Sequence, residues 1–198
     1  MDDSAMGWGG AKGRGRGARR VGLGLPRREM LRAGRAGVGS VSGMAVDFSG
    51  FAVVLKSLGV VGEVRELPDP APTAASAAAQ LGCEVGAIAN SLVFAADGAP
   101  LLVMTSGAHR VDTSRVASLV GASVVSRADP QSVRGWTGQA IGGVGPVGHP
   151  APIRTLVDTW LAKYDVVWAA AGHPHTVFPT SYDELLRITS GTPADVGD

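Results

Sequence analysis

The sequence is poor in several kinds of residue that whole classes of protein require. Cysteine occurs once, at Cys83, which excludes an intrachain disulfide and a cysteine-based zinc or iron–sulfur site. Only four histidines are present, and none is paired with carboxylates at the spacing of metal ligands. Every apolar run is interrupted before the roughly 20 residues that a membrane helix needs. We therefore expect a cytoplasmic protein without a membrane helix or a metal site.

The charge of the chain is unevenly distributed along its 198 residues. Residues 1–43 hold nine of the 18 Lys and Arg but three of the 17 Asp and Glu, a formal charge of +6. The remainder carries −5, so the net +1 hides two different parts. The first segment also holds 12 of the 29 glycines and too little apolar material to offset its ordering entropy.

We expect residues 1–43 to be a disordered basic tail, with a compact domain over 44–191 and a C-terminal tail over 192–198. Two interpretations of the basic tail stay open. It is an RGG-like arm that adds nonspecific affinity for RNA, or it is an inert tail or an over-extended start, with translation in the last case beginning at Met44. The second is favoured because a run of charges is usually only solvated chain.

Within the domain, capping residues and hydrophobic periodicity predict short elements. Thr73, Asp112 and Ser181 are expected N-caps, and Gly82 and Gly121 are expected to end two of the helices. Helices are predicted over 48–58, 74–81, 113–120, 153–162 and 182–188, with one or two helical turns over 85–89 and one turn after 129. Strands are predicted over 64–67, 91–95, 101–105, 123–125, 165–171 and 176–178.

Strands and helices interleave, but neighbouring strands are joined by hairpin signals such as Asp97-Gly98. A doubly wound parallel fold would instead require a helical crossover between such strands. We predict an α+β fold with a mixed, largely antiparallel, barrel-like sheet flanked by helices.

Three motifs are better explained by local structure than by chemistry. Residues 143–148 match the dinucleotide pattern GxGxxG, but Pro150 interrupts the chain where the phosphate-binding helix should start. Ser106 ends a strand and has no local base to activate it, so a turn serine is favoured over a nucleophile. His173 and His175 flank a proline, which favours a tight turn over a metal site.

Four segments in order form a more specific pattern. They are Asn90–Phe94, Ser106–Asp112, Ile141–Gly148 and Ala170–His175. Together they resemble the YbaK/ProX family of aminoacyl-tRNA deacylases, which is similar to the editing domain of bacterial prolyl-tRNA synthetases. The resemblance spans about Val64 to Gly191. It implies a compact mixed β-barrel with flanking helices that hydrolyses the ester between a wrong amino acid and the terminal adenosine of a tRNA.

The resemblance also implies where the chemistry lies. An aminoacyl ester is already activated, so the enzyme has only to position a water or the substrate's 2′-hydroxyl and stabilise the oxyanion. The family's GxxxP loop matches Gly142, Gly143, Val144, Gly145 and Pro146, whose missing Cβ atoms let peptide N–H groups approach the ester. The expected substrate-binding residues are Asn90, Ser91, Gly107, Arg110, Gly172, His173 and His175.

The resemblance further implies the acceptor end of aminoacyl-tRNA as partner, an aminoacyl-tRNA synthetase as a second candidate partner, and no cofactor. One departure matters, because other members carry a lysine at Asn90 that is implied to hold the adenosine phosphate. Asn90 can still donate a hydrogen bond but contributes no charge. Candidates for a local basic patch are Arg110, Arg115, Arg127 and Arg134.

Two hypotheses follow from these residues. The first is a trans-editing hydrolase that clears a mischarged small amino acid, and it is favoured by the intact glycine loop. The second is a catalytically weak module that binds aminoacyl-tRNA or a synthetase, and it is favoured by Asn90. The charge of −5 outside the basic tail argues against strong nonspecific binding of RNA by the domain.

Overall fold

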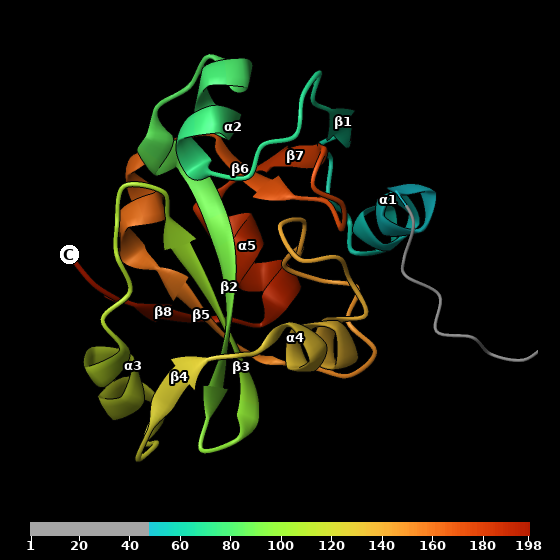
Figure 1. Ribbon diagram of the computed structural model, residues 1–198. Coiled ribbons are helices and arrows are strands. Elements are labelled where there is room, and N and C mark those ends of the chain that lie inside the picture. The colour runs from blue at the N-terminus through green and yellow to red at the C-terminus, as the bar shows by residue number, and fades with distance from the viewer. Residues whose placement is uncertain (1–47) are drawn as a thin grey trace, which may run out of the picture. The chain divides into compact units, whose positions relative to one another are not determined.

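The computed structural model describes residues 48–198, which form one mixed sheet with helices around it (Figure 1). The expectations for residues 1–43 lie outside this range. The described elements follow in the order α1 (Phe48–Ser57), β1 (Arg65–Glu66), α2 (Ala74–Leu81), η1 (Val85–Ala87), β2 (Ile88–Ala96), β3 (Ala99–Ser106), α3 (Thr113–Val120), β4 (Val125–Arg127), α4 (Pro130–Thr137), β5 (Arg154–Asp158), η2 (Thr159–Lys163), β6 (Val167–Ala170), β7 (Thr176–Thr180), α5 (Tyr182–Thr189) and β8 (Thr192–Ala194). They confirm the α+β class.

The described strands pair in the order β1-β7-β6-β2-β3-β5-β8, and β4 also pairs with β2. The pairs β1–β7, β2–β3, β2–β4 and β6–β7 are antiparallel. The pairs β2–β6, β3–β5 and β5–β8 are parallel. The sheet is therefore mixed, with β2 bonded to three strands near the middle of Figure 1.

The hairpin between β2 and β3 turns over two residues, Asp97 and Gly98, with φ of 48° and 85°. Both angles are in the left-handed region, which tight hairpin turns require and which Gly and Asp tolerate. The Asp97 carboxylate accepts the N–H groups of Ser123 and Val124, each at 2.9 Å, and these bonds lower its pKa. The hairpin tip thereby fixes the entry to β4.

The predicted helix caps are confirmed. The side chains of Thr73, Asp112 and Ser181 each accept a backbone N–H of the first turn of their helix. Gly82 and Gly121 end α2 and α3 in the left-handed conformation, at φ of 68° and 70°. Among the described residues, no helix is both long and apolar enough to cross a membrane.

The prediction of a helix over residues 153–162 is wrong, because this segment is β5 followed by the short 3-10 helix η2. The side chains of β5 after Arg154 are buried, since the strand lies between β3 and β8. Residues 192–198, predicted as a tail, contain β8, and Ala194 and Val196 are buried. Both segments depend on parallel partners far away in the sequence.

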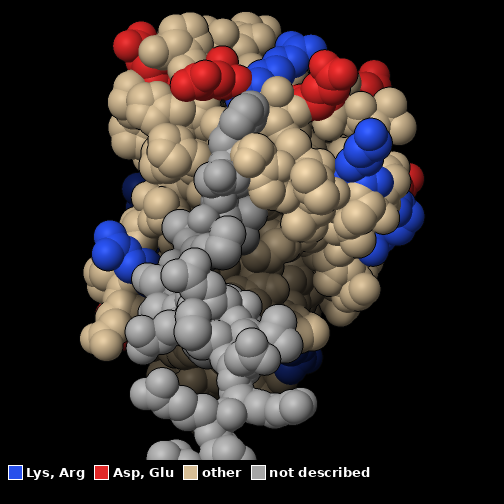
Figure 2. All heavy atoms as spheres, turned by 90° about the vertical axis from the view of Figure 1, so that its right-hand side faces the viewer, with Lys and Arg blue, Asp and Glu red and all other residues tan. Residues whose placement is uncertain are grey.

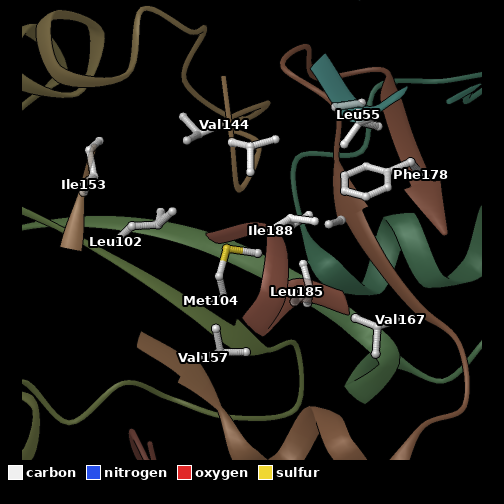
Figure 3. Close-up of a cluster of buried hydrophobic side chains, with 14 of the residues drawn as sticks. Leu55, Leu102, Met104, Val144, Ile153, Val157, Val167, Phe178, Leu185 and Ile188 are labelled. Atoms are coloured by element: carbon white, nitrogen blue, oxygen red, sulfur yellow. The ribbon is translucent and has the colours of Figure 1, made fainter. Parts of the chain in front are cut away.

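The largest buried cluster lies between the sheet and the helices α1 and α5 (Figure 3). Figure 3 shows Met104 between Val157 and Ile188, and Phe178 beside Leu55 of α1. The cluster also includes Val144 from the glycine-rich loop. The loop is therefore anchored to the core rather than held only by its own turn.

Candidate functional site

A cavity of about 310 Å³ lies between the start of α2, the strand β2, the helix α4 and the turn between β6 and β7. Most of its lining is apolar, with Val93, Val133 and Trp168 among the larger side chains. Of the described residues that line it, only Arg127 and His173 have ionisable side chains. Any reaction here therefore proceeds without a lining carboxylate.

Two of the predicted binding residues, Asn90 and Ser91, line the cavity from β2. Their register opposite Thr105 and Met104 of β3 holds them in place. The Ser91 hydroxyl donates to Met104 Sδ at 3.3 Å. The half-buried Asn90 side chain has no hydrogen-bond partner within residues 48–198, so its amide is available to a ligand.

The glycine-rich loop forms one wall of the cavity. Gly142 and Val144 line it, whereas Gly143, Gly145 and Pro146 do not. All of these except Gly142 are buried, so the loop packs against the protein on the side away from the cavity. Of the five residues predicted to be catalytic, two are thus in position to touch a ligand directly.

Among residues 48–198, the backbone N–H groups of the loop are paired at the residues that do not line the cavity and unpaired at the two that do. The Gly143 N–H donates to the Ala140 carbonyl at 3.0 Å, and the Gly145 N–H donates to Gln139 Oε1 at 2.7 Å. The N–H groups of Gly142 and Val144 have no acceptor within the described chain. These two amides, on the two lining residues, are the donors that a carbonyl oxygen in the cavity could use.

Glycine is needed at two positions of the loop for steric reasons. A Cβ atom on Gly143 would lie 2.2 Å from the carbonyl carbon of His173. A Cβ atom on Gly145 would lie 2.5 Å from the ring of Phe51 and 2.9 Å from the Ala170 carbonyl oxygen. The loop is therefore pressed against α1 and against the strand and turn of β6.

The turn after β6 confirms the expected tight turn around Pro174. His173 lines the cavity, and His175 does not, although the two rings stack with centroids 5.5 Å apart. The His175 N–H donates to His173 Nδ1 at 3.3 Å, which makes Nδ1 an acceptor and leaves the proton on Nε2. Gly172 stays outside the lining, where its φ of 86° opens the turn beside Phe51.

Two further predicted residues lie away from the cavity. Gly107 donates its N–H to Ile88 and permits α2 to approach, since a Cβ atom there would be 2.6 Å from Ala74 Cβ. Arg110 donates its backbone N–H to the Asp198 carbonyl, at the C-terminal segment. Gly107 therefore supports the cavity wall, and Arg110 is not part of the site.

Arg127, expected only as one of four candidates for a local basic patch, lies in the lining of the cavity. Its strand β4 pairs with β2, with Arg127 opposite Phe94, and the side chain makes no ion pair within the described chain. Arg65 lies 5.0 Å from the ring of Trp168, another lining residue. On the side of the molecule that Figure 2 shows, acidic side chains lie mainly along the top and basic side chains lie on both flanks.

Two polar groups outside the cavity have structural roles. Ser106 is fully buried and donates to the Gly86 carbonyl at 2.7 Å, so it is not presented as a nucleophile. The buried Asp158 accepts the N–H groups of Ser106 and Trp160, each at 3.0 Å. His109 Nδ1 lies 3.0 Å from the same carboxylate without the geometry of a hydrogen bond.

Among the described residues, no group of three His, Cys, Asp or Glu could hold a metal.

Comparison with known proteins is consistent with this geometry. The sequence profile described as "Aminoacyl-tRNA editing domain" matches residues 68–188, which include every element that lines the cavity. A proline–tRNA ligase of Nitratidesulfovibrio vulgaris is 35% identical over 142 residues, 66% of this chain and 25% of the ligase. The chain thus spans about a quarter of the length of that relative.

Solved structures match over most of their own length. A candidate trans-editing enzyme for prolyl-tRNA synthetase superposes with a TM-score of 0.71 and 39% identity, covering 78% of this chain and 97% of that one. A hypothetical protein of solved structure superposes with a TM-score of 0.68 and 29% identity, covering 73% and 96%. The matches thus include solved chains that are covered almost entirely, as well as a segment of a ligase.

Proposed function

The chain belongs to the aminoacyl-tRNA editing domain family, and from this membership we propose that it is a trans-editing hydrolase that deacylates mischarged aminoacyl-tRNA. The observation that carries the proposal is the pair of unpaired amides, on Gly142 and Val144, in the wall of a cavity without carboxylates. Such an arrangement suits a reaction whose main demand is stabilisation of an oxyanion.

In the proposed reaction, a water or the substrate's 2′-hydroxyl attacks the ester carbonyl carbon. Negative charge develops on the carbonyl oxygen, and the N–H groups of Gly142 and Val144 donate to it. The bond from the carbonyl carbon to the ribose oxygen then breaks, and the proton lost by the nucleophile ends on that oxygen. With water as nucleophile, the products are a free amino acid and an intact tRNA. If the 2′-hydroxyl attacks instead, the acyl group moves to the 2′-oxygen, and water then hydrolyses the new ester.

His173 has a supporting role in this proposal. It is the one imidazole among the described lining residues, and its Nε2–H has no partner within the described chain. From the turn it can hydrogen-bond a ribose hydroxyl or the attacking water. The loop amides and the position of the ester provide the rest of the catalysis.

The size and charge of the cavity fit one end of a tRNA. A volume of about 310 Å³ is at the lower limit for small-molecule sites, enough for a small aminoacyl group and part of its ribose. Arg127 is the one lysine or arginine among the described lining residues, and Trp168 offers an aromatic face. In our proposal, Arg127 contacts a phosphate near the 3′ end and Asn90 donates to the nucleotide.

The test is to incubate the purified full-length protein with a panel of tRNAs, each charged with a correct or an incorrect amino acid. We expect release of a small amino acid from at least one mischarged tRNA, and no release from correctly charged ones. Spontaneous hydrolysis in the same buffer is the baseline. Rates equal to that baseline for every substrate contradict the proposal.

The alternative is a module that binds aminoacyl-tRNA or a synthetase with little turnover, and it is favoured by the uncharged Asn90. The same panel separates the two functions when binding is measured beside release. Saturable binding of aminoacyl-tRNA without release, together with release after Asn90→Lys, identifies the binding module. Release by the wild type identifies the hydrolase.

A further inference from the structure

Gln139 is the one Asn or Gln side chain among the fully buried residues of the described chain, with 2% of its surface exposed. Its Oε1 accepts the Gly145 N–H at 2.7 Å, and its Nε2 donates to the Val147 carbonyl at 2.8 Å. The orientation of the amide is fixed, because an N–H needs an acceptor and a carbonyl needs a donor. One side chain thus pairs two backbone groups of the loop, the donor of Gly145 and the acceptor of Val147.

These bonds replace the sheet ladder that the loop lacks. The loop lies outside every strand, so without Gln139 its buried Gly145 N–H and Val147 carbonyl would be left unpaired away from water, which is unfavourable. At the other backbone group of the same residue, His149 Nε2 lies 3.0 Å from the Gly145 carbonyl oxygen. The loop backbone just beyond Val144 is therefore held by side chains from both directions.

We infer that Gln139 is a positioning residue for the proposed deacylation: by clamping Gly145 and Val147 it sets the position of the Gly142 and Val144 amides in the cavity wall. The inference rests on the proposed function. Gln139 touches no ligand itself, since it does not line the cavity. It acts through the loop, one residue away from the Val144 donor.

The decisive variant is Gln139→Glu, which keeps the shape of the side chain. An ionised carboxylate still accepts the Gly145 N–H but repels the Val147 carbonyl, whereas a protonated carboxyl restores both bonds. Because burial raises the pKa of a carboxyl, the switch should fall between about pH 8 and pH 5. Near pH 8 we expect kcat of Gln139→Glu to be about 10- to 100-fold below that of the wild type, the loss expected when catalytic groups are misplaced by about 1 Å. As the pH falls, kcat of the variant should recover, and its KM should change little.

The chain offers a matched control. Gln80 makes the same two bonds to a single residue, accepting the Asp69 N–H at 3.0 Å and donating to the Asp69 carbonyl at 3.1 Å, and it does not line the cavity. Gln80→Glu should therefore have the wild-type pH profile. His149 and His173, the titratable groups that contact the loop, are present in the wild type and in both variants. The ratio of the kcat of a variant to that of the wild type at each pH therefore reports the effect of the substituted residue alone.

A second measurement does not depend on turnover. In Gln139→Met the Gly145 amide loses its acceptor, so its hydrogen exchange should accelerate at least tenfold, while Gln80→Met leaves it unchanged. If wild type cleaves but Gln139→Glu has a wild-type kcat at every pH, the inference is overturned and the proposed function stands. If wild type cleaves no substrate, the proposed function fails, and unchanged Gly145 exchange in Gln139→Met then overturns the clamp as well.

Discussion

At the scale of the residue, Gly143 of the glycine-rich loop packs tightly against the turn after β6. Because an added Cβ atom would lie 2.2 Å from the carbonyl carbon of His173, one of the two segments must move. We expect Gly143→Ala to lower kcat for the cleaved substrate by about 10- to 100-fold, since an error of about 1 Å has that effect. Single-turnover deacylation measures the loss.

The control for this substitution is Gly135→Ala in α4. A Cβ atom on Gly135 meets no atom within 4 Å, and the residue is helical. Alanine there should leave turnover unchanged and stabilise the protein by about 0.4–1 kcal/mol. If Gly143→Ala and Gly135→Ala are equally active, the close contact at 143 has no catalytic role.

Arg127 supports a second prediction at this scale. Removing the one Lys or Arg side chain among the described lining residues should weaken tRNA binding at low salt. The loss should be only roughly 3- to 10-fold, because solvent and salt screen an exposed charge contact. For a single-stranded 3′ end, the slope of log K against log salt should become shallower by about 0.7. Titrations of Arg127→Ala at several salt concentrations test this.

Arg134→Ala is the matched control, since Arg134 is also exposed and is near Arg127 in sequence, but does not line the cavity. Its salt slope should equal that of the wild type. Equal slopes for all three proteins would show that the phosphate is held by residues other than Arg127.

Part of the candidate site could be predicted from the sequence, through a resemblance that short contiguous motifs carry. Gly142 and Val144 belong to a contiguous glycine loop, and Asn90 and His173 belong to short motifs, so the chain itself brings their neighbours together. Arg127 reaches the cavity only because β4 pairs with β2, which no local pattern encodes.

The role of Gln139 could not be predicted from the sequence either, because no local pattern encodes it. A single glutamine carries no motif, and its role follows only from the two backbone groups that the fold places on it. A polar residue between Gly138 and the apolar Ala140 and Ile141 was the one available signal.

At the scale of the element, α2, α3 and α5 were predicted with nearly their observed bounds, because a cap and its helix are within four residues of each other. Thr73, Asp112 and Ser181 illustrate this. The helix α4 is longer than the single turn that was predicted after 129. The segment that became β5 was predicted as a helix because its partners are distant: Leu102 of β3 lies opposite Thr155. Parallel pairing of this kind leaves no turn signal in the sequence.

The loop also gives a prediction of pH dependence. Burial lowers the pKa of His149 below its ordinary 6.5, and the contact with the Gly145 carbonyl only partly opposes this. Below about pH 6.5 the unfolded chain therefore takes up a proton that the folded protein does not, so stability falls as the pH falls through that value.

His149→Gln should remove this component, because a glutamine amide can donate to the same carbonyl and does not titrate. We expect Tm of the wild type to fall more than Tm of His149→Gln between about pH 7.5 and pH 5.5. Parallel curves over this range would contradict the assignment.

At the scale of the whole molecule, the last residues complete the sheet. β8 pairs with β5, Val196 is fully buried, and Asp112 donates its N–H to the Val196 carbonyl. Val196→Ala should therefore lower the free energy of unfolding by about 1–2 kcal/mol, from two buried methyl groups at about 0.8 kcal/mol each. Denaturant unfolding measures the change.

Val61→Ala is the comparison, since Val61 is 90% exposed. It should have no measurable effect on unfolding. Equal stability of the two variants would mean that the C-terminal segment is dispensable, as a tail would be.

The proposed oxyanion donors belong to the main chain, and this has a consequence for how the site can be lost or detected. Every amino acid except proline supplies the same N–H at residue 144, so drift in side-chain identity leaves that donor in place. An alanine scan across the loop would report packing defects and would miss the donors themselves. Replacing the amide at Gly142 or Val144 by an ester, which deletes one N–H and keeps every side chain, is the substitution that would detect them.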